Sequence, residues 1–177
     1  MLDEYSIGRS TRISPESPVL VVDNIAKEFQ LGGAGNVARN MSGLGLNVDL
    51  LTILGNDWAG KKIEELCIAS RIKLVTGQRS GNSTVKHRIV SNGQQVLRID
   101  GNINLSLKEK QEVLEIFENV VIQYNVLAFS DYNKGVLELL PDMLRIAKRL
   151  GIPTFIDPKV NQLERYSECF LIKACVF

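Results

Sequence analysis

Apolar residues recur along this chain with two spacings, one typical of short buried strands and one typical of helices that bury a single face. Helical spacing and end signals predict helices over residues 34–44, 58–70, 106–120 and 141–150. Apolar runs predict strands over residues 47–54, 72–75, 126–130, 152–156 and 170–172. Because helices alternate with strands from residue 34 onward, the pattern predicts an α/β fold with a parallel sheet covered by helices on both faces.

Two segments do not follow this alternation. Residues 5–24 are rich in strand formers and are interrupted by Ser14-Pro-Glu-Ser-Pro18. Residues 84–90 and 94–100 predict two more strands, and Asn92-Gly93 between them is a strong hairpin signal. We expect these segments to form a small antiparallel sheet outside the main one.

A glycine-rich bend precedes the first predicted helix. Gly32, Gly33 and Gly35 carry no side chains, so a ligand can approach the main chain closely. The helix start that follows offers unpaired N–H groups and the positive end of the helix dipole. This arrangement suits hydroxyl groups and anions, and we interpret residues 32–36 as a ligand-binding bend.

Polar residues at the ends of the predicted parallel strands support a site on the same side of the sheet. In open α/β folds, ligands bind beyond the carboxyl ends of the strands. The residues predicted there are Asp57, Asp131, Asp157 and Lys159.

A dinucleotide site is a weaker alternative. Gly33-Ala-Gly35-Asn-Val-Ala38 also fits the pattern G-x-G-x-x-A, which has little specificity alone. Such a loop should follow a buried strand directly, yet Lys27-Glu28-Phe29-Gln30 precedes it. A purely structural interpretation, in which the glycines only permit tight packing, explains Gly45 better than it explains the bend.

The composition excludes several classes of protein. The 177 residues include 21 basic and 20 acidic side chains, a net charge of +1, which does not favour a nucleic-acid or membrane partner. The apolar runs are too short or interrupted to cross a bilayer, and acidic residues near the start do not fit a signal peptide. Cys67, Cys169 and Cys175 are odd in number and widely spaced, so we expect free thiols, a cytoplasmic location and no metal site.

The glycines also form a long spaced motif. It consists of Gly32-Gly33-x-x-Asn36-x-Ala38, six residues, Gly45, nine residues and Gly55. In this respect residues 1–173 resemble the ribokinase-like carbohydrate kinases, also called the phosphofructokinase B family. Within that family they are most similar to D-glycero-β-D-manno-heptose 7-phosphate kinases, often the first domain of a bifunctional enzyme that makes ADP-heptose for lipopolysaccharide. The segments that support this similarity are Met1-Leu-Asp-Glu-Tyr5, Ser10-Thr-Arg-Ile-Ser-Pro-Glu-Ser-Pro18, Lys86-x-Arg88, Gln94-Gln95-x-x-Arg98-x-Asp100, Ser130-Asp-Tyr-Asn-Lys-Gly135 and Ile156-Asp-Pro-Lys159.

The resemblance implies a ribokinase-like parallel sheet with a small β lid, and a set of substrate-binding residues. Asp3 resembles the family aspartate that binds sugar hydroxyls, and Gly32, Gly33 and Asn36 resemble the sugar-binding loop. Lid segments would cover about residues 5–24 and 83–100, with the α/β core at 30–82 and 101–173. The other residues expected at the substrate are Lys86, Arg88, Arg98, Asp131, Lys134 and Lys159.

The lid cations have a physical rationale of their own. Thr84, Lys86 and Arg88 share one face of a strand because side chains alternate, and His87 points to the other face. We therefore expect Lys86, Arg88 and Arg98 to neutralise a substrate phosphate, and His87 to be a surface or lid-packing residue and not a base.

The implied function is ATP-dependent phosphorylation of the heptose 7-phosphate at O1, with Mg²⁺, and with contacts between two copies through the lid. Two alternatives stay open: another sugar kinase of the family, which would not need the lid cations, and a non-catalytic module that binds a sugar phosphate or dimerises.

The family's catalytic aspartate lies in a C-terminal Gly-Ala-Gly-Asp motif, and neither that motif nor Pro-Asn-x-x-Glu occurs here. We assign no catalytic residue. We expect residues 1–177 to be the N-terminal part of one sugar-kinase domain with the C-terminal half missing and an aberrant tail at 174–177. We expect the chain alone to be inactive, and to be poorly soluble or only partly folded, because a sheet interrupted midway exposes a strand edge and apolar faces.

Overall fold

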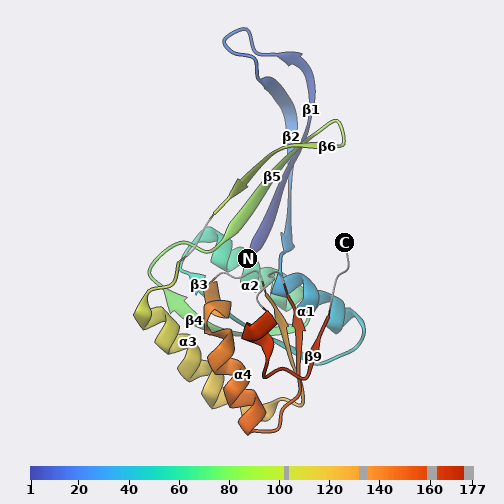
Figure 1. The fold of residues 1–177 in the computed structure, drawn as a ribbon. Helices are drawn as coiled ribbons and strands as arrows, with labels where there is room; N and C mark the ends of the chain where they lie inside the picture. Colours follow the sequence, from blue (N-terminus) through green and yellow to red (C-terminus); the bar gives the residue numbers. More distant parts are fainter. Residues whose placement is uncertain (102–103, 132–134, 159–162, 174–177) are drawn as a thin grey trace.

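A computed structural model describes residues 1–101, 104–131, 135–158 and 163–173 (Figure 1). A long β sheet projects from an α/β body, and the N-terminus lies where the two parts meet (Figure 1).

The projecting sheet, here called the lid sheet, has four strands in the order β2-β1-β5-β6. They are β1 (Leu2–Ile13), β2 (Leu20–Leu31), β5 (Val85–Ser91) and β6 (Gln94–Asp100). β1–β2 and β5–β6 are antiparallel, but the central pair β1–β5 is parallel, from Leu2↔Val85 to Gly8↔Ser91. The prediction of an antiparallel sheet is therefore wrong for this pair. Both strands leave the body in the same direction, so they run side by side outward (Figure 1).

The lid strands also extend beyond the predicted limits. β2 continues through Lys27-Glu28-Phe29-Gln30 to Leu31, where the sequence pattern indicated no strand. Most of β2 and all of β6 are exposed or half-exposed, and a sheet with a solvated face accepts polar side chains readily.

The body alternates helices and parallel strands, as predicted. Its elements are α1 (Ala34–Gly43), β3 (Val48–Gly55), α2 (Trp58–Ala69), β4 (Ile72–Arg79), α3 (Leu107–Val120), β7 (Leu127–Ser130), α4 (Leu140–Arg149), β8 (Thr154–Asp157) and β9 (Leu171–Ile172), with short 3₁₀ turns at Val121–Gln123, Gly135–Leu139 and Leu163–Tyr166. β3 pairs with β4, and β8 pairs with both β7 and β9, all in parallel register. β4 is longer than predicted and ends at Arg79.

Two apolar clusters lie on opposite sides of β3. Leu50 and Leu54 pack with α1 and α2, and that cluster also includes Leu2 and Leu31 at the base of the lid. Ile53 belongs to the other cluster, with residues of α3 and α4. Helices therefore cover both faces of the β3–β4 sheet, which is separate from the β7-β8-β9 sheet in its hydrogen bonding, and the first cluster joins the lid to the body.

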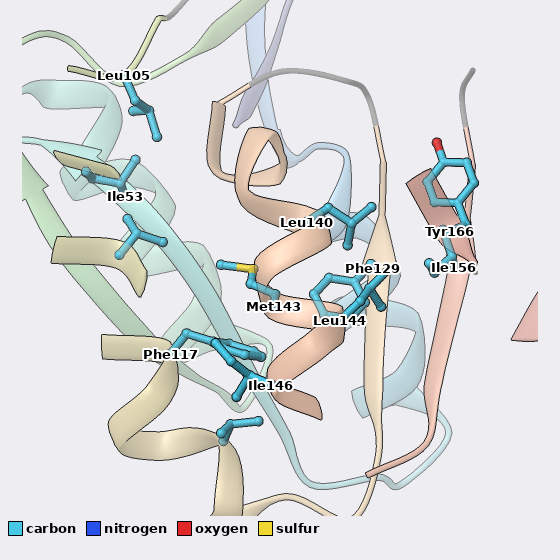
Figure 2. Packing of buried hydrophobic residues seen from close by; sticks show 12 residues of the cluster. Ile53, Leu105, Phe117, Phe129, Leu140, Met143, Leu144, Ile146, Ile156 and Tyr166 are labelled. Carbon is cyan, nitrogen blue, oxygen red and sulfur yellow. The ribbon is translucent and has the colours of Figure 1, made fainter. Parts of the chain in front are cut away.

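Helix α4 supplies the centre of the second cluster. Its Leu140 and Leu144 lie on the side of Phe129 of β7 and Ile156 of β8, whereas Met143 points away from these strands, toward α3 (Figure 2). Leu140 and Leu144 are fully buried, and burying one leucine side chain contributes roughly 1.5–3 kcal/mol.

Local end signals are confirmed. Ser106 and Glu109 form the predicted capping box, with both reciprocal hydrogen bonds present. Asn92 and Gly93 have φ angles of 51° and 81°, which is the left-handed backbone that a two-residue hairpin turn requires. In the described part of the chain, none of the helices combines the length and the hydropathy needed to pass through a bilayer.

We expect Leu144→Ala to lower the free energy of unfolding by about 2–5 kcal/mol, because it removes buried methyl groups and leaves a cavity. Urea unfolding would measure the change. Leu107→Ala is the matched control, since Leu107 is 85% exposed, and its effect should stay below about 0.5 kcal/mol. Equal losses for the two variants would contradict the core described here.

Candidate functional site

The structure brings the carboxylate of Asp3 against the glycine bend. Asp3 lies on β1, in register with Gln30 of β2, just before the chain turns into α1. A Cβ atom on Gly32 would lie 2.7 Å from Asp3 Oδ2, so no side chain fits there while Asp3 holds its position. The amide of Gly32 donates to the carbonyl of Met1 at 3.0 Å, which fixes the bend to the start of β1.

The bend leads directly into α1. Gly33 is the N-cap residue, with a φ angle of 56° that glycine adopts without strain, and no side chain caps the helix. The first turn of α1 contains no acidic residue, so its dipole is uncompensated there. Asn36 is exposed in this turn, and its Oδ1 accepts a hydrogen bond from Arg39 at 3.2 Å.

The predicted lid cations lie on the same face of the lid sheet as Asp3. Residues paired across neighbouring strands point to the same side. The pairs that define this surface, here called the Asp3 face, are Asp3↔Lys86, Tyr5↔Arg88, Lys86↔Asp100 and Arg88↔Arg98. The structure therefore brings Asp3, Gly32, Lys86, Arg88 and Arg98 to one region.

Arg88 contacts Asp3 directly. Its Nη1 donates to Asp3 Oδ1 at 2.9 Å, and both side chains are largely buried. The hydrogen bond to Asp3 raises the pKa of Arg88 above its ordinary value, so the guanidinium stays charged. The guanidinium also lies 5.2 Å from the ring centroid of Tyr5, within cation–π range. Arg98 instead pairs with Asp100 at 2.9 Å.

This pair has chemical consequences. The second carboxylate oxygen of Asp3 faces the bend, where it can accept a hydroxyl donor. Arg88 has further N–H donors beyond the one given to Asp3, and a guanidinium can bind a phosphate with two parallel bonds. The arrangement can therefore bind a hydroxyl group and an anion side by side.

The remaining predicted residues are placed differently. Asp131, at the end of β7, is 2% exposed and accepts a hydrogen bond from the Tyr166 hydroxyl at 2.7 Å. Tyr166 is itself buried beside Ile156 (Figure 2). A substrate contact for Asp131 stays a prediction. Lys134 and Lys159 lie outside the described residues.

The opposite surface of the lid sheet, here called the Glu4 face, holds a polar cluster of which the sequence analysis predicted only the side of His87. Glu4 is only 5% exposed, and its Oε1 lies 2.9 Å from Lys27 Nζ and 4.0 Å from His87 Nε2. His87 also forms a 2.8 Å hydrogen bond with Ser6. The sequence signal that could have indicated this cluster is the alternation of side chains along β1, which puts Leu2, Glu4 and Ser6 on one face.

A second group lies where the lid leaves the body; it joins Asp57, which was predicted at the carboxyl end of a strand, to Ser83, which was not predicted. Asp57 caps α2 by accepting from the Gly60 amide at 2.8 Å, and it also accepts from the Ser83 amide at 3.0 Å. The Ser83 hydroxyl in turn accepts from the Gly55 amide at 2.9 Å. Burial alone would raise the pKa of Asp57, but the hydrogen bonds from Gly60 and Ser83 hold it below its ordinary value.

Among the described residues, no three His, Cys, Asp or Glu side chains gather as a metal site would need. Cys67 and Cys169 are free thiols, and Cys175 lies outside the described residues.

Sequence comparison identifies relatives along the whole chain. A model of the family described as pfkB family carbohydrate kinase matches residues 6–174. The protein called "Bifunctional protein HldE" in Actinobacillus pleuropneumoniae is 38% identical over 173 residues, which are 97% of this chain and 36% of that protein. The protein of the same name in a Nitratiruptor species is 35% identical over 175 residues, which are 98% of this chain and 37% of that protein. The chain thus spans little more than a third of the length of these relatives.

Solved structures share the fold. A putative phosphofructokinase from Staphylococcus aureus aligns with a TM-score of 0.72 and 16% identity, over 93% of this chain and 52% of that one. A possible 1-phosphofructokinase from Thermotoga maritima aligns with a TM-score of 0.69 and 18% identity, over 95% of this chain and 54% of that one. The predicted ribokinase-like architecture is confirmed, and the chain covers about half of each neighbour.

We expect Asp3 and Arg88 to be energetically coupled, because removing either leaves a largely buried charge unpaired. In a double-mutant cycle, the combined loss for Asp3→Ala with Arg88→Ala should be at least about 1 kcal/mol smaller than the sum of the single losses. Urea unfolding would measure each free energy.

The exposed pair Lys62–Glu65 on α2 is the control for this cycle, and its coupling should stay below about 0.5 kcal/mol. Additive losses at Asp3 and Arg88 would contradict the pairing.

Proposed function

The chain belongs to the pfkB family of carbohydrate kinases, and on that premise we propose that it forms the sugar-binding part of a D-glycero-β-D-manno-heptose 7-phosphate kinase. That kinase would transfer the γ-phosphoryl group of ATP to O1 and supply the 1,7-bisphosphate for ADP-heptose synthesis. Similarity to HldE proteins over 97–98% of this chain supports the heptose substrate, together with the motifs described above.

The observation that supports this proposal most directly is the contact between Asp3, Gly32 and Arg88. Asp3 Oδ2 lies against the bare backbone of the bend, and Arg88 binds Oδ1 at 2.9 Å. We propose that sugar hydroxyls donate to Asp3 and that Lys86, Arg88 and Arg98 bind the 7-phosphate. A sugar without phosphate would not need cations on the Asp3 face.

The described residues would bind and orient the sugar, whereas we assign the chemical step to groups beyond them. The family's Gly-Ala-Gly-Asp motif, whose aspartate is the base, does not occur in this sequence. Among the described residues no acidic cluster fits Mg²⁺, so we assign neither the metal nor ATP to particular side chains here.

Contacts between two copies through the lid are also part of the proposal. Large apolar side chains on the lid strands are about half-exposed, including Ile13, Leu20, Ile25, Leu97 and Ile99. Analytical ultracentrifugation would measure the oligomeric state.

We expect the chain to bind heptose 7-phosphate without ATP, as measured by isothermal titration calorimetry. Arg88→Ala should weaken binding at least about tenfold, because a charge-assisted contact to phosphate is worth more than about 1.4 kcal/mol. Its effect on unphosphorylated heptose should be much smaller. Arg9→Ala is the control, since Arg9 lies exposed on β1, farther from the bend.

Other outcomes of this titration identify the alternatives. Equal binding of phosphorylated and unphosphorylated sugars would favour another kinase of the family. Binding of NAD instead would support the dinucleotide site.

We expect no phosphoryl transfer by residues 1–177 alone, because the motif that supplies the base is not in the sequence. The assay follows ADP and heptose bisphosphate with ATP, Mg²⁺ and heptose 7-phosphate present. Turnover above background would overturn this expectation.

A further inference from the structure

One connection between the body and the lid is tied to a neighbouring turn. Residues 80–84, here called the lid connection, join β4 to β5, and residues 55–57 form the turn from β3 into α2. Ser83 contacts this turn in two directions: its amide donates to Asp57 at 3.0 Å, and its hydroxyl accepts from Gly55 at 2.9 Å. Ser83 is 6% exposed, so both bonds are shielded from water.

The backbone packing around this contact leaves no space for a side chain at Gly55 or Gly60. A Cβ atom on Gly55 would lie 2.2 Å from the carbonyl oxygen of Gly81, and one on Gly60 would lie 2.3 Å from the carbonyl oxygen of Gly55. On its other side, Gly81 packs against Arg79. A Cβ atom added at Gly81 would lie 2.7 Å from a guanidinium nitrogen of Arg79. Arg79 is largely buried and lies 3.8 Å from Glu109 at the start of α3. The lid connection is therefore held from two sides.

The contact lies next to the start of the strand that bears the predicted phosphate ligands. The carbonyl of Thr84 accepts a 2.8 Å hydrogen bond from Leu2, and Val85 begins the register with β1. Lys86 lies three residues after Ser83, opposite Asp3. A one-residue slip of β5 would turn Lys86 and Arg88 to the other face of the sheet. The position of Ser83 therefore determines which side chains face Asp3.

We propose that Asp57 and Ser83 are positioning residues for the sugar-phosphate site, which fix the point where β5 leaves the body and so hold Arg88 against Asp3. This inference rests on the proposed function for the identity of the ligand. Neither residue touches Asp3 or Arg88 in any contact described above, and both act through the backbone of β5.

Asp57→Asn and Ser83→Ala test the proposal. Asparagine keeps one oxygen and remains a good helix cap, but its amide nitrogen cannot accept from Ser83. Ser83→Ala removes the acceptor for Gly55. Asn56→Ala and Ser80→Ala are matched controls, because both side chains are exposed in the same turn and the same connection.

The first measurement is amide hydrogen exchange, which needs no ligand. We expect both test variants to speed exchange in β5 and in its pairing with β1 at least about tenfold, while amides of α3 and α4 keep their rates. The controls should match the unsubstituted chain. Unchanged exchange in β5, or uniform acceleration throughout the chain, would overturn the proposal. If Ser83→Ala does not fold, Asp57→Asn supplies the test, since it retains the cap.

The second measurement is the affinity for heptose 7-phosphate. We expect each test variant to bind about three- to tenfold more weakly, and we expect this loss to disappear when Arg88→Ala is already present. If Asp57 and Ser83 only stabilise the fold, the losses of affinity that their variants cause should add to the loss caused by Arg88→Ala. Failure of the unsubstituted chain to bind, with the exchange response intact, would overturn the proposed substrate and not the positioning of β5.

Discussion

The parallel pairing of β1 with β5 is the constraint on which the candidate site depends. It places Asp3 beside Lys86 and Arg88, which are more than eighty positions away in the sequence. The antiparallel return of β2 then brings the chain to Gly32, directly against the Asp3 carboxylate. The central strand β1 pairs on both of its edges. This double pairing brings together the Asp3 carboxylate, the bare backbone of the bend and the Arg88 guanidinium.

That same strand separates two sets of charges by the alternation of its side chains. Asp3 and Tyr5 point to one face and Glu4 and Ser6 to the other. On the Glu4 face the buried carboxylate is balanced by Lys27 and lies near His87, whereas on the Asp3 face Arg88 balances Asp3. Each acidic residue has a cation within reach, which is necessary because an unpaired buried charge costs several kcal/mol. Asp3 lies against Gly32 of the glycine bend, so a ligand at Gly32 meets the charges of the Asp3 face.

Features that depend on adjacent residues were predictable from the sequence, and those that depend on distant ones were not. The capping box at Ser106 and the turn at Asn92-Gly93 follow from local hydrogen bonding and left-handed backbone, and both are present. The parallel β1–β5 pair, the polar end of β2 and the bonds of Ser83 depend on tertiary contacts that leave no periodic signal. In the site, the bend itself followed from its glycines. Its proximity to Asp3 came from resemblance to a family, because spacing alone cannot bring residue 3 to residue 32.

The central position of the first strand also constrains how the molecule is built during translation. Leu2 pairs with Val85, so β1 emerges from the ribosome long before one of its two neighbours is synthesised. Until then the early hairpin has an open hydrogen-bonding edge, and ordering the intervening chain costs entropy before the pairing compensates. Such an edge is a template for pairing with other strands, so we expect the nascent chain to be most prone to aggregation until residue 91 has left the tunnel.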